Sequence, residues 1–479
     1  MSSHHVFLAV KRAPVHYQVD PDTGELGAVL SAGGTANVVA EQAGLMDVTL
    51  VASATSDDDR RAAELHPDGL TVDFTVDSPV KLHLIRHAPE VFEDVQYAFQ
   101  SDLMWAAFNS GWDTWTTPSF DASTRRSWDH FMQFTDDFAA KMLEMSSDTA
   151  EPIFLLHDYQ MICLPPLLRE HRPASRILLF VHVPWPGADY WRITPRYMRT
   201  TVIERMLRSD VVGFFADRWV NNFLHCVADQ LPDAQIDRAT STVTYNGHTT
   251  RIETMPLGYS SDALASRDRQ LSQDIVDWAA DAQLVVHSGR TDPMKNGVRA
   301  VQAFVLAMTQ NPGLRGTAKL LMRTNPNRLY IAANADYMKR LEDAVDSANK
   351  ELGAEVVQLL CENDVSGTMA SYEHADVLFF NSTIDGQNLS VYEASLLNTN
   401  NAPVILSETC GASETLKDVC RIVNPFDLQE QADALRDALM ATPEVRRSDF
   451  ALRYDVAAKY SLDSWIAQQM ASILSAGAK

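Results

Sequence analysis

The sequence has few cysteines, little positive charge and no long apolar run. Its five cysteines among 479 residues are an odd number without close metal-ligand spacing, which predicts reduced thiols rather than a disulfide framework or a zinc site. The formal net charge of −23 argues against a nucleic-acid partner, whose backbone needs a basic stripe. No segment approaches the roughly 18 apolar residues of a membrane span, and the N-terminus lacks a basic region followed by an apolar run. We therefore expect a soluble, cytoplasmic protein with no membrane or nucleic-acid partner.

The length and the alternation of strand and helix patterns predict a two-domain α/β protein. A chain of 479 residues exceeds what one core usually supports. Short apolar runs bounded by turn or polar residues are typical of parallel strands. They occupy residues 6–10, 48–52, 153–156, 177–183 and 211–215, then 284–287, 319–322, 377–380 and 404–406. Helical spacing at 128–145, 300–309 and 337–352 lies between them, so we predict two doubly wound, Rossmann-like domains.

A Pro/Gly-containing stretch at residues 255–259 predicts the domain boundary. It would divide the chain into a domain of residues 1–254 and a domain of residues 255–454. Helical spacing from 461 to 476 leads us to expect that residues 455–479 pack back onto the first domain. Two such domains that face each other across a cleft would form a ligand site.

Basic residues follow one of the predicted strands in the second half. Arg290-Thr-Asp-Pro-Met-Lys295 comes directly after the apolar run 284–287 and the pair Ser-Gly. Ligands of open parallel sheets bind at the carboxyl ends of the strands. Arg290 would offer a planar fork of donors there and Lys295 a mobile point charge, which suits a diphosphate. By itself such a pair is usually a solvated surface feature.

A second stretch, Asp385-Gly-Gln-Asn-Leu-Ser-Val-Tyr-Glu393, follows the run 377–380 in the same way. The amides of Asn388 and Leu389 would face a phosphate at the start of a helix. Glu393 would lie about two helical turns beyond Asp385 and accept hydrogen bonds from a ribose or sugar hydroxyl. Asp-Gly alone is most often a simple turn, but its occurrence with the basic stretch in one half of the chain favours a nucleotide-sugar site.

The first half supplies candidate partners for this site. Gly33 and Gly34 follow the first strand region and would let backbone amides approach a phosphate. His157-Asp158-Tyr159 and His182 follow two successive predicted strands. A Gly-Gly pair is usually a turn, and an unpaired core histidine is the ordinary interpretation of either imidazole. Histidine and aspartate at two neighbouring strand ends favour a site instead.

Taken in order, these motifs resemble glycosyltransferase family 20, the trehalose-6-phosphate synthases. The resemblance extends from about Phe7 to Leu474 and also includes His182-Val-Pro-Trp-Pro and Leu406-Ser-Glu-Thr-Cys-Gly-Ala. It implies a GT-B fold and an enzyme that transfers a unit from a nucleotide donor to a phosphorylated acceptor, with retention of configuration. Further stretches, among them Asn325-Pro-Asn-Arg-Leu-Tyr and Asn381-Ser-Thr-Ile-Asp-Gly, are similar to the pseudoglycosyltransferases of the family, which join a cyclitol instead of a sugar.

The resemblance implies roles for individual residues. Those implied in catalysis are Asp158, His182, Arg290 and Lys295. Those implied in donor binding are Gly33, Gly34, Arg290, Lys295, Cys361, Thr383, Ile384, Asp385, Gln387, Asn388, Leu389 and Glu393. Those implied in acceptor binding are Arg12, Gln96, Trp105, Asp158, Tyr159 and Arg328. No cofactor and no metal are implied, because the two basic side chains can neutralise the leaving diphosphate.

Departures from the usual synthase pattern bear on the substrates. Gln387 stands where synthases have a methionine beside the donor, and Gln96 replaces a tyrosine nine residues before Trp105, which puts glucose 6-phosphate as acceptor in doubt. The resemblance places guanine beside Cys361 and the pair Thr383 and Ile384, so we expect a GDP-linked donor. Neutral variation at the two glutamines is the alternative.

Three hypotheses follow. The first is a pseudoglycosyltransferase that couples a GDP-cyclitol such as GDP-valienol to an aminocyclitol 7-phosphate through nitrogen. The second is a trehalose-6-phosphate synthase that uses GDP-glucose and glucose 6-phosphate. The third is a non-catalytic, nucleotide-sugar-binding regulator, which we disfavour because every residue implied in catalysis is present. Whether the protein forms a homo-oligomer stays open.

Overall fold

The chain divides into two compact units in the computed structural model, which describes residues 5–31, 34–74 and 79–476. The first unit comprises Met1–Met255 together with Trp465–Lys479, and the second comprises Pro256–Ser464. We expected the returning segment to begin at residue 455, but helix α18 (Pro443–Ala457) packs within the second unit. The residues that return belong to the next helix, α19 (Leu462–Ala476), from Trp465 onward.

A ten-stranded sheet forms the centre of the first unit within the described residues. Its order is β10-β11-β12-β9-β8-β7-β1-β4-β6-β5, and β12 to β6 in this order are parallel. The parallel strands are β1 (Val6–Arg12), β4 (Val48–Ser53), β6 (Pro79–Ile85), β7 (Ile153–His157), β8 (Arg176–Phe180), β9 (Val211–Phe214) and β12 (His248–Thr254). The antiparallel edges are β5 (Leu70–Asp73), β10 (Gln235–Asp237) and β11 (Thr242–Tyr245). Central strands such as β7 and β4 are buried on both faces, as their continuous apolar runs predict.

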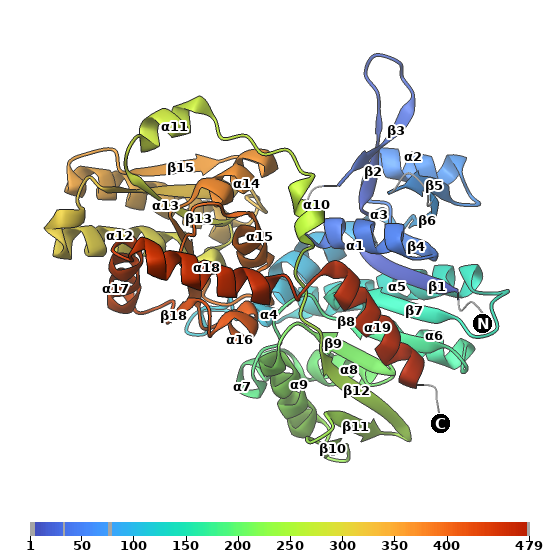
Figure 1. The fold of residues 1–479 in the computed structure, drawn as a ribbon. Helices are drawn as coiled ribbons and strands as arrows, with labels where there is room; N and C mark the ends of the chain where they lie inside the picture. Colours follow the sequence, from blue (N-terminus) through green and yellow to red (C-terminus); the bar gives the residue numbers. More distant parts are fainter. Residues whose placement is uncertain (1–4, 32–33, 75–78, 477–479) are drawn as a thin grey trace. The chain divides into compact units, whose positions relative to one another are not determined.

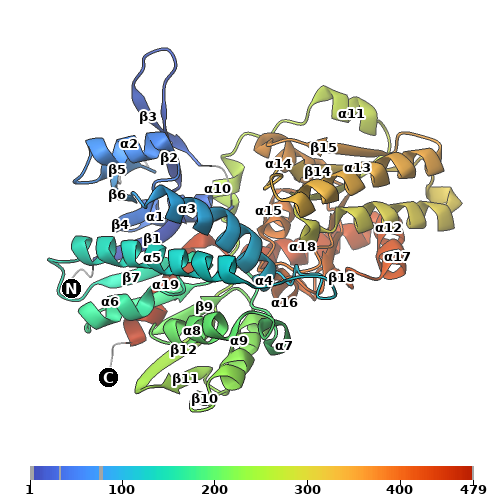
Figure 2. The ribbon, with the colours of Figure 1, turned by 180° about the vertical axis from the view of Figure 1, so that it is seen from behind.

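Helices cover both faces of this sheet. Helix α5 (Ala122–Met145) lies on one face, and α19 lies on the other (Figure 1, Figure 2). Asp121 caps α5 by accepting hydrogen bonds from the N–H groups of Ser123 and Thr124. The remaining helices are α1 (Gly34–Leu45), α2 (Asp57–Leu65), α3 (Pro89–Asp94), the π-helix η1 (Val95–Met104), α4 (Trp105–Phe108), η2 (Tyr159–Met161), α6 (Pro165–His171), α7 (Ala188–Trp191), α8 (Arg196–Met206) and α9 (Asp217–Gln230). A separate hairpin consists of β2 (Val15–Val19) and β3 (Leu26–Leu30).

The second unit has a six-stranded parallel sheet in the order β15-β14-β13-β16-β17-β18. Its strands are β13 (Gln283–Arg290), β14 (Ala318–Asn325), β15 (Val357–Cys361), β16 (Val377–Phe380), β17 (Val404–Ser407) and β18 (Arg421–Val423). Successive side chains of a strand point to opposite faces. Val377 and Phe379 accordingly enter one hydrophobic core, whereas Leu378 and Phe380 enter the other.

Each of these two cores is closed by its own helices. Residues of α12 (Gly297–Gln310), α13 (Ala332–Leu352) and α17 (Leu428–Leu439) form the first core with the sheet. Residues of α14 (Val365–His374), α15 (Leu389–Leu397) and the end of α18 form the second. Shorter elements are α10 (Ser261–Ala265), α11 (Gln273–Ala279), η3 (Pro293–Lys295), η4 (Pro312–Leu314) and α16 (Ala412–Leu416).

The predicted class, two doubly wound Rossmann-like α/β domains, is confirmed. The strand predicted at residues 177–183 is shorter in the structure. It ends at Phe180, and Val181 to Val183 continue as a loop. Among the described residues, no helix is both long and apolar enough to cross a membrane.

Candidate active site

The predicted site residues of each unit lie at the carboxyl ends of its parallel strands. His157 is the last residue of β7, and His182 follows the end of β8 by two residues. In the second unit, Arg290 is the last residue of β13, and Asp385 follows the end of β16. These are the positions at which open α/β sheets bind ligands. Each unit therefore carries one group of candidate site residues, which we call the half-site of that unit without reference to the other unit.

Lys295 and Asp385 form an ion pair in the half-site of the second unit. The Nζ atom of Lys295 lies 2.5 Å from a carboxylate oxygen of Asp385, and the two side chains are 17% and 15% exposed. The loop that carries Lys295 is held by the strand before it, because His287 of β13 lies 3.1 Å from the carbonyl oxygen of Lys295. Burial lowers the pKa of His287 to about 4, so this imidazole is neutral and adds no positive charge beside the lysine.

Asp292 is a buried carboxylate between the two basic residues of the first stretch. Its oxygens lie 2.8 Å from Nε of Arg290 and 3.5 Å from the guanidinium of Arg328, and the amide of Asn327 donates to it at 3.1 Å. Burial raises the pKa of Asp292, but the nearby Arg290, Arg328 and Lys295 outweigh it and the net pKa is lowered. The carboxylate is thus ionised and holds two predicted site arginines.

Sequence reasoning missed Asp292, although it lies two residues after Arg290. An acidic residue inside a basic stretch was the available signal, because a buried carboxylate needs cationic partners. Arg328, assigned to the acceptor by the resemblance, belongs to the second unit and shares this carboxylate with Arg290. Its backbone is left-handed, with φ of 48°.

The loop from Asp385 to Leu389 is fixed by a neighbouring turn. Asp385 forms a parallel bridge with Cys410, and the N–H of Gly411 donates to the carbonyl oxygen of Asp385 at 3.1 Å. Asn388, with φ of 69°, precedes helix α15. The helix begins at Leu389, so Glu393 lies about one turn into it. The expectation that Glu393 would lie two helical turns beyond Asp385 was therefore wrong, because residues 385–388 are not helical.

Gln387 braces this loop from within the second unit. Its side chain is buried, and its amide nitrogen donates to the carbonyl oxygen of Leu257 at 3.0 Å and to the hydroxyl of Tyr392 at 2.9 Å. Both amide hydrogens are thereby used. The structure places this side chain inside the unit rather than on an open surface beside a ligand.

The residues expected around a base lie after β16, as Asp385 does, and at the end of β15. The N–H of Thr383 donates to the carbonyl oxygen of Met294 at 2.8 Å, which joins the loop after β16 to the turn before Lys295. Ile384 is partly exposed. Cys361 ends β15 and is exposed.

Asp158 and His182 form the centre of the half-site in the first unit. Asp158 has φ of 74°, outside the range that most residues adopt, and its carboxylate accepts a hydrogen bond from the N–H of His182 at 3.1 Å. Burial raises the pKa of Asp158 to about 6. The two histidines are not unpaired core residues, because Nδ1 of His157 lies 2.9 Å from Nε2 of His182.

Other predicted acceptor residues also belong to the first unit. Tyr159 is buried, and its hydroxyl donates to the carbonyl oxygen of Gln100 at 3.2 Å. Gln96 belongs to the π-helix η1 and Trp105 is the first residue of α4, and π-helical segments are frequent at functional sites. Arg12 is exposed at the end of β1.

The structure describes only one residue of the glycine pair. Gly33 lies outside the described residues, and Gly34 is the first residue of α1. Within the described ranges, no group of three or more His, Cys, Asp and Glu side chains is arranged to hold a metal ion.

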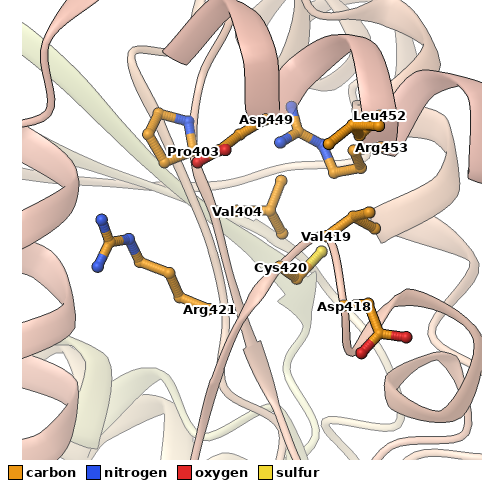
Figure 3. Close-up of a pocket in the computed structure, with 9 residues that line it drawn as sticks. All are labelled: Pro403, Val404, Asp418, Val419, Cys420, Arg421, Asp449, Leu452 and Arg453. Carbon is orange, nitrogen blue, oxygen red and sulfur yellow. The ribbon is translucent and has the colours of Figure 1, made fainter. Parts of the chain in front are cut away.

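A small cavity of about 140 Å³ in the second unit lies on other elements (Figure 3). It is lined by Pro403, Val404, Asp418, Val419, Cys420, Arg421, Asp449, Leu452 and Arg453. Arg453 is fully buried and donates to the carbonyl oxygen of Ala402 at 2.7 Å, which ties α18 to the start of β17. None of the predicted site residues is among those that line it.

Two doubly wound domains with ligand-binding strand ends are the architecture of the GT-B fold, which solved trehalose-phosphate synthase structures share with this chain. The family model of glycosyltransferase family 20 matches residues 10–475, and the chain belongs to this family. It is therefore a glycosyltransferase-type enzyme, and the hypothesis of a non-catalytic regulator is set aside.

Relatives and solved structures agree with this assignment. The chain is 53% identical over 470 residues to validamine 7-phosphate valienyltransferase of Streptomyces hygroscopicus subsp. jinggangensis, covering 98% of this chain and 94% of the relative. It is 23% identical to the UDP-forming α,α-trehalose-phosphate synthase of Candida albicans, covering 78% and 79%. The structure of a Burkholderia xenovorans α,α-trehalose-phosphate synthase in complex with glucose-6-phosphate matches with a TM-score of 0.83 at 18% identity, covering 98% of this chain and all of that chain.

Proposed function

We propose that this enzyme is a pseudoglycosyltransferase that transfers a valienol-type cyclitol from a GDP-linked donor to an aminocyclitol 7-phosphate. The observation that carries the proposal is the 53% identity to a validamine 7-phosphate valienyltransferase over 98% of the chain. The trehalose-phosphate synthase of Candida albicans shares 23%. The reaction would resemble that of a validoxylamine A 7'-phosphate synthase.

The second unit would bind the donor. Arg290 and Lys295 would contact the diphosphate and stabilise the charge that develops as it leaves. Asp385, held by Lys295 at 2.5 Å, would bind hydroxyls of the transferred ring. Glu393, one turn into α15, would bind the ribose. The guanine would lie near Cys361, Thr383 and Ile384, a proposal that rests on the family resemblance.

The acceptor would be bound by charged and polar groups. Arg12 and Arg328 would bind its phosphate through paired N–H donors. The carboxylate of Asp158 would accept hydrogen bonds from its hydroxyls or its amine. Gln96, Trp105 and Tyr159 would enclose the ring.

Transfer would proceed with retention and without a covalent enzyme intermediate. The bond between the donor ring carbon and the phosphate oxygen breaks, and a bond to the acceptor nitrogen forms on the same face. The departing phosphate oxygen takes the proton that the nitrogen loses. Positioning and electrostatic stabilisation would supply the catalysis. A double displacement would need a carboxylate nucleophile beside that carbon, and Asp158 is the candidate to test for it.

A trehalose-6-phosphate synthase activity with GDP-glucose and glucose 6-phosphate is the second candidate. It is favoured by the fold, which matches a synthase crystallised with glucose-6-phosphate at a TM-score of 0.83. The two candidates differ in the transferred ring and in the attacking atom, nitrogen or oxygen. Both use a phosphorylated acceptor.

A product assay by mass spectrometry separates the candidates. Purified enzyme is given GDP-valienol, GDP-glucose or UDP-glucose, each with validamine 7-phosphate or glucose 6-phosphate. A nitrogen-linked pseudodisaccharide phosphate from the cyclitol pair alone supports the proposal, and trehalose 6-phosphate from GDP-glucose would replace it by the second candidate. The same assay after dialysis against EDTA tests the proposed independence from metal ions, because a loss of turnover that Mg²⁺ restores would contradict it.

A further inference from the structure

The buried imidazole of His157 lies directly behind His182 in the first unit. His157 is completely buried at the end of β7, and its Nδ1 atom is 2.9 Å from Nε2 of His182. The other ring nitrogen of His157, Nε2, is buried and has no hydrogen-bond partner among the described residues. His182 is partly exposed. The pair therefore links a buried ring to a ring that reaches the half-site.

Neither imidazole is charged. Burial lowers the pKa of His157 to about 3, and burial together with the neighbouring His157 lowers the pKa of His182 well below its usual value. Two neutral rings share one hydrogen bond and hence a single proton. In one arrangement Nδ1–H of His157 donates to Nε2 of His182. In the other, Nε2–H of His182 donates to Nδ1 of His157.

The unpartnered Nε2 atom of His157 distinguishes the two arrangements. If His157 accepted the shared hydrogen bond at Nδ1, its own proton would be on Nε2, as a buried N–H without an acceptor. If His157 donates from Nδ1, Nε2 carries only a lone pair. Buried N–H groups without acceptors are rare in native proteins, and unsatisfied acceptors are better tolerated. Trp465, whose ring packs against His157, already has a buried indole N–H without an acceptor. A second buried N–H without an acceptor would add to the desolvation cost at this place.

Aromatic rings hold His182 in this orientation. Phe180, Phe215 and Trp465 have ring centroids 4.9, 5.5 and 6.0 Å from the centroid of His182. The backbone N–H of His182 is fixed by Asp158 at 3.1 Å. Rotation of the imidazole would break its hydrogen bond to His157 and disturb this packing.

We propose that His157 is a positioning residue that fixes the tautomer of His182, so that His182 carries its proton on Nδ1 and presents an N–H donor to the ligand. Nδ1 of His182 has no hydrogen-bond partner in the described part of the chain. An N–H donor there suits a hydroxyl oxygen of the transferred ring. The choice of ligand rests on the proposed function, whereas the tautomer follows from the pair alone.

The tautomer is measured by nitrogen NMR on the whole enzyme labelled with ¹⁵N-histidine. Protonated and unprotonated ring nitrogens have widely separated shifts, and the signals are assigned by their loss in His157 and His182 variants. We expect the shift of a protonated nitrogen at Nδ1 of both residues. A protonated Nε2 in His182 would overturn the proposal. This measurement needs no substrate, so it stands even if the proposed function fails.

Two substitutions of His157 test the consequence for the reaction. In His157→Asn the side-chain amide can donate from nearly the position of Nδ1, whereas His157→Leu removes the donor. We expect kcat/KM for the cyclitol donor to fall about 5- to 10-fold in the leucine variant, the scale of one neutral hydrogen bond, and to recover substantially in the asparagine variant. The affinity for free GDP should be unchanged in both.

Full activity of the leucine variant, or equal losses in the two variants, would contradict a role of the hydrogen-bond donor at position 157. If neither variant folds, the wild-type spectrum decides the tautomer. The expected spectrum together with no product from any donor would remove the proposed function and leave the tautomer assignment intact.

Discussion

Asp292 is the side chain that two predicted site cations share. Arg290 and Arg328 both contact its buried carboxylate, and Asn327 and Asn334 donate to it as well. A buried carboxylate is stable only when such partners replace its water. Asp292 therefore contributes to the position of both guanidiniums.

Asp292→Asn should lower kcat/KM by about 10- to 100-fold, because small displacements of a positioned group cost rates of that order. It should also lower the free energy of unfolding by about 1 to 3 kcal/mol, since two guanidiniums lose one ionised partner. Steady-state kinetics and chemical denaturation measure the two effects. The control Asp343→Asn removes an exposed pair with Lys339 in the same unit and should change stability by less than about 0.5 kcal/mol. An Asp292→Asn variant as active as the wild type would show that Arg290 does not need this partner.

The pKa of Asp158 gives the enzyme an acid limb. Burial raises this pKa from 3.8 to about 6, and the proposed acceptor contact requires the ionised form. We expect kcat/KM for the acceptor to fall tenfold per pH unit well below pH 6. Profiles of kcat/KM against pH from 5 to 7, measured for the wild type and for Asp158→Glu, test this. A wild-type profile that is flat over this range would contradict it.

The same shift predicts a gain in stability from loss of the charge. Because the folded pKa of Asp158 is raised, its contribution to stability is present below pH 3.8 and is lost as the pH rises through about 6. The difference between the two pKa values corresponds to at most about 3 kcal/mol at pH 8. Asp158→Asn should therefore be inactive yet more stable than the wild type at pH 8, and no more stable at pH 4. Thermal unfolding at both pH values decides this, and equal stability at pH 8 would mean that the carboxylate is not destabilised.

At the scale of elements, the turn at Gly411 supports the loop from Asp385 to Leu389, which we call the donor loop. A Cβ atom at this position would lie 2.1 Å from the carbonyl oxygen of Gly386, a distance that the backbone cannot accommodate without a shift. The bridge from Asp385 to Cys410 and the hydrogen bond from Gly411 to Asp385 would move with it.

Gly411→Ala should weaken binding of the nucleotide donor by tenfold or more while most of the fold persists. The matched control is Gly313→Ala in the same unit, where a Cβ atom would meet nothing within 4 Å. Calorimetric titration with GDP and with the donor compares the two variants. Wild-type affinity in Gly411→Ala would show that this loop does not set the donor site.

Elements with uninterrupted apolar runs could be predicted from the sequence, and others could not. The runs at 153–156 and 377–380 correspond to β7 and β16 because both faces of these strands are buried. The strand β6, next to the edge strand β5, was missed because its apolar run is interrupted by the exposed Lys81. The π-helix at Val95–Met104 has no comparable sequence signal, and the non-helical residues before Leu389 shifted Glu393 by a turn.

The site was predictable as strand-end motifs but not as contacts. Arg290, Lys295 and Asp385 were identified from their positions after apolar runs. The pairing of His157 with His182, the carboxylate of Asp292 and the inward direction of Gln387 depend on residues far apart in the sequence. Such contacts follow from tertiary packing, which single motifs do not specify.

At the scale of the whole molecule, the C-terminal helix completes the first unit. Trp465 is fully buried and packs against Phe180, His157 and His182. Farther along, Arg251 of β12 donates to the hydroxyl of Ser475 at 3.0 Å. The C-terminal helix and residues from the first half of the sequence thus belong to one unit, although the second unit lies between them in the chain.

Trp465→Ala should destabilise the first unit by about 3 to 5 kcal/mol, the usual cost of truncating a buried tryptophan. Hydrogen exchange should show lost protection in β7 and β8 and unchanged protection in β13 and β16. The control Leu474→Ala lies on the same helix at a position that is 38% exposed and should cost less than about 1 kcal/mol. Equal effects of the two substitutions would contradict the role of the tryptophan.

One competition experiment tests the proposed reaction most directly. The enzyme receives GDP-valienol and GDP-glucose at equal concentrations, together with validamine 7-phosphate and glucose 6-phosphate, and the products are quantified by mass spectrometry over the first turnovers. We expect the nitrogen-linked pseudodisaccharide phosphate to form in large excess over every other product. Trehalose 6-phosphate as the main product would contradict the assignment as a pseudoglycosyltransferase.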